Sequence, residues 1–256
     1  MIHEILYEKP NRLGILSGST IKIIACISML IDHVGYLFFP YGDEYRIIGR
    51  IAFPLFAYFI AEGSYYTKKP LKRILILFSL SILFIIAYYI VDGYIYINVF
   101  TSFSISALCI YILDKGKTWA FKSKDYLPKL ILTLFVISLI IIPVYYLYKD
   151  VKADYEIMGV LLPIIISLVY FKKYNAPKYL CAFDNYYVRM ILFIIGLIFL
   201  HKYSDFYVQE YQALALIPLI LYNGKPGNKK MKWGFYLFYP VHMVVLYGIY
   251  YLMHLI

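Results

Sequence analysis

Charged side chains are scarce in this sequence. Only 16% of the 256 residues are Asp, Glu, Lys or Arg, whereas 62% are hydrophobic. A soluble domain of this length is about half apolar and about a quarter charged, so the composition excludes a soluble domain with a large core. Helices satisfy their own backbone hydrogen bonds in lipid. The composition therefore predicts an all-α, polytopic integral membrane protein whose main partner is the lipid bilayer.

Motifs for metal binding and for common soluble chemistries are also missing. The three cysteines, Cys26, Cys109 and Cys181, lie far apart in or beside apolar runs, which fits neither a metal site nor a disulfide framework. The sequence has no HExxH pair, no phosphate-binding glycine loop, no nucleophile elbow and no CxxC. We therefore expect no metal cofactor, and we look for chemistry among the ionisable residues inside apolar runs.

Apolar runs long enough to cross a membrane recur along the whole chain. About 20 apolar residues span a bilayer. On this template we expect about nine transmembrane helices in one bundle, which would form a single domain over residues 1–256. The expected spans are 20–40, 47–66, 71–91, 96–113, 127–148, 156–172, 188–202, 211–224 and 234–255.

Basic residues alternate between the two ends of these spans. Most of the 25 lysines and arginines lie in the N-terminal segment and in every second loop, including residues 68–73 and 225–232. Positive charge marks the cytoplasmic side, so the pattern predicts a cytoplasmic N-terminus and an outer C-terminus. The net charge of +10 then follows from topology, and we expect no nucleic-acid partner.

Two ionisable residues, Asp32 and His33, lie inside the first long apolar run. Such a residue costs several kcal/mol unless it is paired or lines a wet cavity, so it marks a candidate functional site. Asp32 belongs to a stripe of small and polar residues at helical spacing, which predicts that it faces the bundle; the stripe is Ala25, Ser28, Asp32 and Gly35. His33 lies about 100° round the helix, so the two side chains need different partners.

A further histidine, His242, lies in the last apolar run. At about 1.5 Å per residue, His242 lies about 12 Å and His33 about 20 Å into their spans, both near the middle of a core about 30 Å thick. A neutral imidazole is the usual general base near neutral pH. The two histidines therefore predict a shared midplane site with either one as the base. The alternative is that Asp32 and both histidines are satisfied core residues.

Two arginines follow on the first connection. Arg46 and Arg50 are four residues apart and share one face of a helix, and guanidinium groups suit phosphate or carboxylate recognition. We interpret Arg46 as a headgroup contact or a partner of Asp43 or Glu44, and Arg50 as the stronger site candidate. Glu62, near the inner end of the second span, either anchors its helix to the lysines that follow or takes part in catalysis.

These residues, in this order, resemble the TraX family. The resemblance spans nearly the whole chain and is most specific at its two ends. It rests on Leu30-Ile31-Asp32-His33-Val34-Gly35, Gly49-Arg50-Ile51-Ala52-Phe53-Pro54, Glu62-Gly63, Ala153-Asp154-Tyr155, Leu221-Tyr222-Asn223-Gly224 and Phe238-Tyr239-Pro240-Val241-His242. TraX proteins are named for the factor that acetylates the N-terminus of conjugative pilin. They are similar to a wider set of membrane acyltransferases, including the acyltransferase-3 proteins and the lysosomal glucosaminide acetyltransferase.

The resemblance implies a multi-pass acetyltransferase of the bacterial inner (cytoplasmic) membrane. It would move an acetyl group from cytosolic acetyl-CoA to an amine or hydroxyl of a membrane-associated or extracytoplasmic acceptor, such as a peptide, a protein N-terminus or a glycan. The implied catalytic residues are His33 and His242, as candidate bases, and Asp32, which would orient a histidine. The implied contacts to acetyl-CoA are Arg46, Arg50, Glu62, Lys68, Asn223 and Tyr239.

The charge pattern places the two arginines on the outer side, whereas acetyl-CoA is cytosolic. Either the pantetheine threads inward to a midplane site, or the arginines serve the acceptor, or their segment re-enters the membrane. We favour threading, with the basic loops at 68–73 and 225–232 holding the nucleotide phosphates. Two other functions fit the same buried charges: a proton-coupled transporter and a non-enzymatic membrane assembly factor.

Overall fold

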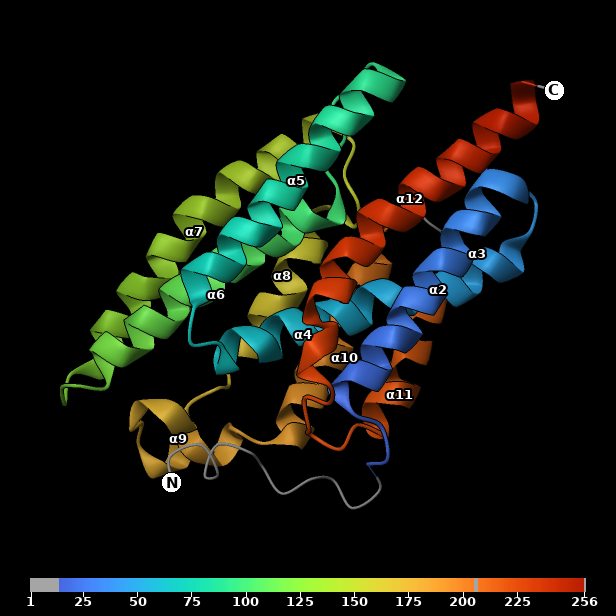
Figure 1. Ribbon diagram of the computed structural model, residues 1–256. Helices are drawn as coiled ribbons and strands as arrows, with labels where there is room; N and C mark the ends of the chain where they lie inside the picture. Colours follow the sequence, from blue (N-terminus) through green and yellow to red (C-terminus); the bar gives the residue numbers. More distant parts are fainter. Residues whose placement is uncertain (1–13, 205–206, 256) are drawn as a thin grey trace. The chain divides into compact units, whose positions relative to one another are not determined.

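The computed structural model describes residues 14–204 and 207–255 (Figure 1). Over these residues the chain is helical, with two isolated β-bridges and no strand. The predicted all-α class is confirmed for this part of the chain. The predicted cytoplasmic N-terminus concerns residues 1–13, which lie outside the described residues, so this orientation stays a prediction.

Eleven α-helices and three short 3-10 helices make up the described chain. The longer helices are α2 (Gly18–Phe38), α4 (Ala52–Tyr66), α5 (Pro70–Asp92), α6 (Val99–Ala120), α7 (Tyr126–Asp150), α8 (Glu156–Ser167), α10 (Tyr186–Lys202) and α12 (Lys232–Leu255). The shorter elements are α3 (Asp43–Gly49), η1 (Lys172–Tyr174), α9 (Lys178–Phe183), η2 (Tyr207–Ala215), α11 (Leu216–Ile220) and η3 (Lys229–Met231).

Six segments of the described chain are long and apolar enough to cross a membrane, which supports a multi-pass membrane protein. They are Gly18–Phe38, Asp43–Tyr66, Pro70–Val91, Val99–Ala120, Tyr126–Asp150 and Lys232–His254. The expected number of nine is not confirmed. In the expected spans at 156–172 and 188–202, α8 has 12 residues and α10 has 17; a 12-residue helix covers only about 18 Å of a core about 30 Å thick.

The expected span at 211–224 is not one helix. It is divided between the end of η2 and the five-residue helix α11. Pro218 lies in the middle of α11 and has no N–H to continue a regular helical ladder. The expected span is 14 residues long, shorter than the roughly 20 that cross a bilayer, and it folds into two still shorter pieces.

The chain divides into two compact units, which we describe separately. The terminal unit joins the two ends of the chain, Met1–Phe56 with Asp205–Ile256, and the middle unit is Ala57–Ser204. Helix α4 begins in the first and ends in the second. The expectation of a single domain stays a prediction.

In the terminal unit, α2 packs between α3 and α12, and α3 also packs against η2 (Figure 1). The predicted stripe of small residues on α2 lies at these contacts, because Ala25, Ser28 and Gly35 are buried. A Cβ atom added to Gly35 would collide with the side chain of Tyr45 on α3. The small residues thus allow the two helices to approach closely.

In the middle unit, α6 packs against α5, α7 and α8. Helix α6 begins at a fully buried cap, where the side-chain oxygen of Asn98 accepts hydrogen bonds from the backbone N–H groups of Phe100 and Thr101. Ser106 joins α6 to α8 by donating to the carbonyl oxygen of Val160 at 2.7 Å. Such side chains satisfy backbone groups that lipid cannot hydrate.

A buried lysine of α6 caps the C-terminal end of α8. Lys117 is only 3% exposed, and its Nζ donates to the backbone carbonyls of Ser167, Leu168 and Tyr170 at 3.0, 2.8 and 2.9 Å. The last carbonyls of a helix have no partner within the helix, and a cation there is favoured by the helix dipole. Lys117 therefore holds α6, α8 and the following chain together.

We expect Lys117→Met to lower the free energy of unfolding by about 2 to 3 kcal/mol, because a hydrogen bond to a charged group contributes about 1.5 to 3 kcal/mol and three carbonyls would lose theirs. Chemical denaturation in detergent micelles measures the effect. Lys115→Met, an exposed position on the same helix, should change stability by less than about 0.5 kcal/mol. Equal stability of the two variants would contradict the capping role.

Candidate functional site

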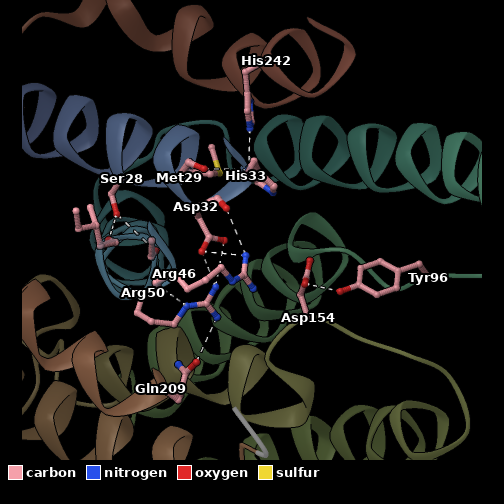
Figure 2. A network of polar contacts seen from close by, with 12 residues as sticks. Ser28, Met29, Asp32, His33, Arg46, Arg50, Tyr96, Asp154, Gln209 and His242 are labelled. Atoms are coloured by element: carbon pink, nitrogen blue, oxygen red, sulfur yellow. Dashed lines mark hydrogen bonds and ion pairs between the residues drawn. The ribbon is translucent and has the colours of Figure 1, made fainter. Parts of the chain in front are cut away.

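The terminal unit contains a carboxylate shared by two guanidinium groups (Figure 2). Arg50 Nη2 donates to both carboxylate oxygens of Asp32, at 2.9 and 3.1 Å. Arg46 Nη1 lies 3.1 Å from Asp32 Oδ1 and 3.4 Å from the Asp32 backbone oxygen. The side chains of Asp32 and Arg50 are only 14% and 7% exposed, so this is a largely desolvated ion cluster.

Local sequence explains how the arginines reach Asp32. They are four residues apart, at the end of α3 and just after it, so both point from one face of this helix toward α2. Gly49 lies at the closest approach, where an added Cβ would collide with the Asp32 carboxylate. Ser28 Oγ, one turn earlier on α2, donates to the Ile48 carbonyl at 2.5 Å. A glycine and a serine thus bring α3 against α2.

Two buried glutamines of η2 extend the cluster. Arg50 Nη1 lies 3.5 Å from Gln209 Oε1, and Gln209 Nε2 donates to Gln212 Oε1 at 2.9 Å. Residues three apart eclipse each other on a 3-10 helix, which places both amides on one side. Neither glutamine is among the predicted site residues. Two glutamines at spacing three in an apolar run are the signal that could have found them.

The histidines of α2 and α12 are joined by a hydrogen bond. His33 Nδ1 lies 3.0 Å from His242 Nε2 and 3.0 Å from the Met29 carbonyl oxygen. His242 Nδ1 lies 2.7 Å from the Phe238 carbonyl oxygen. Figure 2 shows His242 pointing down onto His33. The two rings therefore lie in one site, as their expected depths predicted.

The contacts assign the protons of both rings. A carbonyl oxygen only accepts hydrogen bonds, so Nδ1 of His242 carries the proton that it donates to Phe238. Nδ1 of His33 likewise carries the proton that it shares between the Met29 carbonyl and His242 Nε2. In neutral rings the other nitrogen is then an acceptor. This leaves His33 Nε2 as a basic nitrogen with no hydrogen bond to the residues that the structure describes.

Aromatic side chains surround the pair. Tyr239 lies edge-on to both imidazoles, with ring centroids 6.0 Å from His33 and 5.4 Å from His242. Phe238 stacks on His242 at 4.8 Å. Both His242 and Tyr239 are buried. The predicted site residue Tyr239 thus lines the histidine pair, whereas its predicted contact with acetyl-CoA stays a prediction.

The other predicted site residues lie elsewhere. Asn223 forms a turn with Gly224, in which its side-chain oxygen accepts a hydrogen bond from the Lys225 N–H at 2.9 Å. Glu62, on α4, and Lys68, between α4 and α5, belong to the middle unit, which we describe separately. The structure therefore brings together Asp32, His33, Arg46, Arg50, Tyr239 and His242, and the roles of all nine predicted residues stay predictions.

Two expected pairings differ from the structure. We expected Arg46 to contact headgroups or to pair with Asp43 or Glu44, but it binds the Asp32 carboxylate. We expected Asp32 to orient a histidine, but its carboxylate oxygens accept from guanidinium groups. Asp32 and His33 lie about 100° apart on the helix. Asp32 therefore contacts the arginines at the end of α3, and His33 contacts α12. Backbone carbonyls orient the two histidines instead.

A family model described as TraX protein matches residues 17–250, which include the entire cluster. The chain belongs to the TraX family. A probable fimbrial assembly protein, FimC of serogroup H1 from Dichelobacter nodosus, is 25% identical over 260 residues, covering 90% of this chain and 94% of that protein. The uncharacterized protein RP591 of Rickettsia prowazekii (strain Madrid E) is 45% identical over 56 residues, 22% of each chain. No solved structure matches.

In this TraX protein, Asp32→Ala should destabilise the terminal unit by about 3 to 5 kcal/mol, because it removes the partner of a buried ion pair. Arg50→Met should also destabilise it, and the double variant should lose about 0.5 to 3 kcal/mol less than the sum of the two. The free energies of unfolding of the wild type, both single variants and the double variant, measured by denaturation in detergent, complete this double-mutant cycle.

Glu44→Gln serves as the control, because it changes an exposed acid of α3 and should shift stability by less than about 0.5 kcal/mol. Additive losses in the cycle would show that Asp32 and Arg50 do not stabilise each other.

Proposed function

We propose that this protein is an acyltransferase of the inner membrane that moves an acetyl group from acetyl-CoA to an amine or hydroxyl. The acceptor would be membrane-associated or extracytoplasmic: a peptide, a protein N-terminus or a glycan. Membership of TraX, a family linked to pilin acetylation, supports the reaction. The relative that matches over most of this chain is named as a probable fimbrial assembly protein, and this name supports an acceptor at the cell surface.

The observation that carries the proposal is the basic Nε2 of His33, held beside a buried ion cluster. An attacking amine or hydroxyl must lose a proton, and a positioned imidazole accelerates such a step by about 10²- to 10⁴-fold. The hydrogen bonds that His33 Nδ1 donates to the Met29 carbonyl and to His242 Nε2 fix the ring, so that Nε2 is the accepting nitrogen. His33 thus has the protonation state that a general base needs.

The arginines suit the negative charge of the reaction. When a nucleophile attacks a thioester, charge develops on the carbonyl oxygen, and fixed donors in a water-poor site stabilise it strongly. Arg46 and Arg50 bind the carboxylate of Asp32, the residue next to His33, so their guanidinium groups lie beside the same site. Asp32 holds Arg46 and Arg50 in place and balances part of their charge.

The donor set fits acetyl-CoA, whose phosphates and thioester oxygen need cationic and N–H donors. We propose that Arg46, Arg50 and Tyr239 contact the reacting end of the co-substrate. Within the same unit, Asn223 would contact its remainder and the basic loop at 225–232 would hold the nucleotide phosphates; contacts from Glu62, Lys68 and the loop at 68–73 stay predictions of the sequence. The chemistry that acetyl-CoA supplies is an activated acyl group on a good thiol leaving group.

We expect the detergent-purified protein to bind acetyl-CoA and to release coenzyme A when a small amine or hydroxyl acceptor is added. His33→Ala should keep acetyl-CoA binding but lose at least about 10²-fold in turnover, because the base is gone. His254→Ala is the matched control, since His254 is exposed on α12 and also contacts the carbonyl four residues earlier, at 2.8 Å. Thiol release measures turnover, and calorimetry measures binding.

Failure of every form to bind acetyl-CoA would contradict the proposal and favour transport or packing for the buried charges. Normal activity of His33→Ala would remove His33 as the base. If His33→Ala lost binding, turnover and thermal stability together, an assembly factor with structural histidines would explain the data better.

Asp32→Asn should lower the turnover number strongly while the protein stays in the membrane. The amide keeps the shape of the carboxylate but cannot balance the charge of the two arginines, so both guanidinium groups lose their orientation. Turnover normalised to the amount of protein in the membrane fraction measures this. Full activity of the variant would exclude Asp32 from the mechanism.

A further inference from the structure

We propose that His33 and His242 form a proton relay, in which His33 Nε2 takes the proton of the attacking amine or hydroxyl while His33 Nδ1 passes its proton to His242 Nε2. This inference rests on the proposed acyltransferase function and goes beyond it by giving the two histidines different tasks. His33 contacts the substrate, and His242 stores the proton.

The direction of the relay follows from the backbone contacts. Phe238 accepts from Nδ1 of His242, so Nε2 is the acceptor of that ring; Met29 accepts from Nδ1 of His33, so the proton between the rings belongs to His33. The rings are joined at 3.0 Å between Nδ1 of His33 and Nε2 of His242, a normal hydrogen-bond length. With the two carbonyls in place, the first transfer between the rings runs from His33 Nδ1 to His242 Nε2.

The step is balanced in protons and electrons. The nitrogen or oxygen of the acceptor forms a bond to the acyl carbon, and its proton goes to the lone pair of His33 Nε2. The Nδ1 proton of His33 moves to His242 Nε2, so His33 becomes its other neutral tautomer and His242 becomes an imidazolium. The carbon–sulfur bond breaks, its electron pair leaves with the thiolate, and the stored proton returns along the same path to the sulfur.

The surroundings suit a charge on His242. An ionised group near the bilayer centre is costly unless its environment stabilises it. Phe238 stacks face to face on His242, and a ring face attracts a cation, while the Phe238 carbonyl accepts the Nδ1 proton at 2.7 Å. Arg46 and Arg50 bind the carboxylate of Asp32, the residue next to His33; moving the positive charge from His33 to His242 places it on α12, which carries neither arginine.

The decisive variant is His242→Gln. A glutamine side chain has a carbonyl oxygen that can accept the hydrogen bond from His33 Nδ1, but it cannot store a proton. We expect the turnover number to fall at least about 30-fold with unchanged affinity for acetyl-CoA and unchanged thermal stability. His254→Gln, which replaces the exposed histidine of α12, should keep full activity. His242→Ala, which removes the hydrogen bond as well, should be no more active than His242→Gln.

Two measurements separate the relay from a merely orienting role. The turnover number of the wild type, followed in mixtures of H2O and D2O, should report two protons in motion, and that of His242→Gln only one. Nitrogen NMR of the ¹⁵N-histidine-labelled protein should show both rings protonated at Nδ1, with nitrogen–nitrogen coupling across their hydrogen bond. His242→Gln should lose this coupling, because its acceptor is an oxygen.

The outcomes are distinct. Turnover by His242→Gln within about twofold of wild type, or protonation of His33 at Nε2 in the resting protein, would overturn the relay and leave the acyltransferase function intact. Absence of acetyl transfer by the wild type, with the Nδ1 protons and the coupling as assigned, would instead overturn the acyltransferase function, and the relay would fall with it.

Discussion

The terminal unit depends on one carboxylate in an apolar surrounding. Asp32 accepts hydrogen bonds from Arg50 and lies in contact with Arg46. Charges in such surroundings persist only when they are paired and hydrogen-bonded. Asp32 therefore sets where α3 lies on α2, because no other register of the two helices would bring both guanidinium groups to the carboxylate. Gly35, Ser28 and Gly49 serve this register by keeping the helices close.

Helix α2 contacts α3 on one face and α12 on another, so Asp32 and His33 have different neighbours. One face of α2 carries Asp32, which binds the arginines at the end of α3. The neighbouring face carries His33, which forms a hydrogen bond to His242 of α12. A carboxylate bonded directly to the imidazole would hold a proton there. Asp32 instead binds the arginines. The side chain that accepts a hydrogen bond from the His33 ring is therefore the His242 imidazole. Adjacent residues of α2 thus have separate partners: guanidinium groups for Asp32 and a second imidazole for His33.

Much of the arrangement could be predicted from helical geometry. The angle between Asp32 and His33 requires different partners for them, and the depth of His242 matches that of His33, because both follow from the rise and turn of an α-helix. The partner of Arg46 could not be predicted, because it depends on how α3 docks on α2 and not on spacing within α3. Gln209 was missed for a related reason, since the residues around it form a 3-10 helix whose period differs from that of the apolar helices.

The terminal unit is assembled from both ends of the chain, with the middle unit between them in sequence. During synthesis a chain folds from its N-terminus onward, so α2, with Asp32 and His33, is made before the middle unit and before α12. His242 is made 209 residues after His33. A nascent or truncated chain without α12 therefore has Asp32 and its arginines but lacks the second imidazole, and the pair of histidines forms only after α12 has been made.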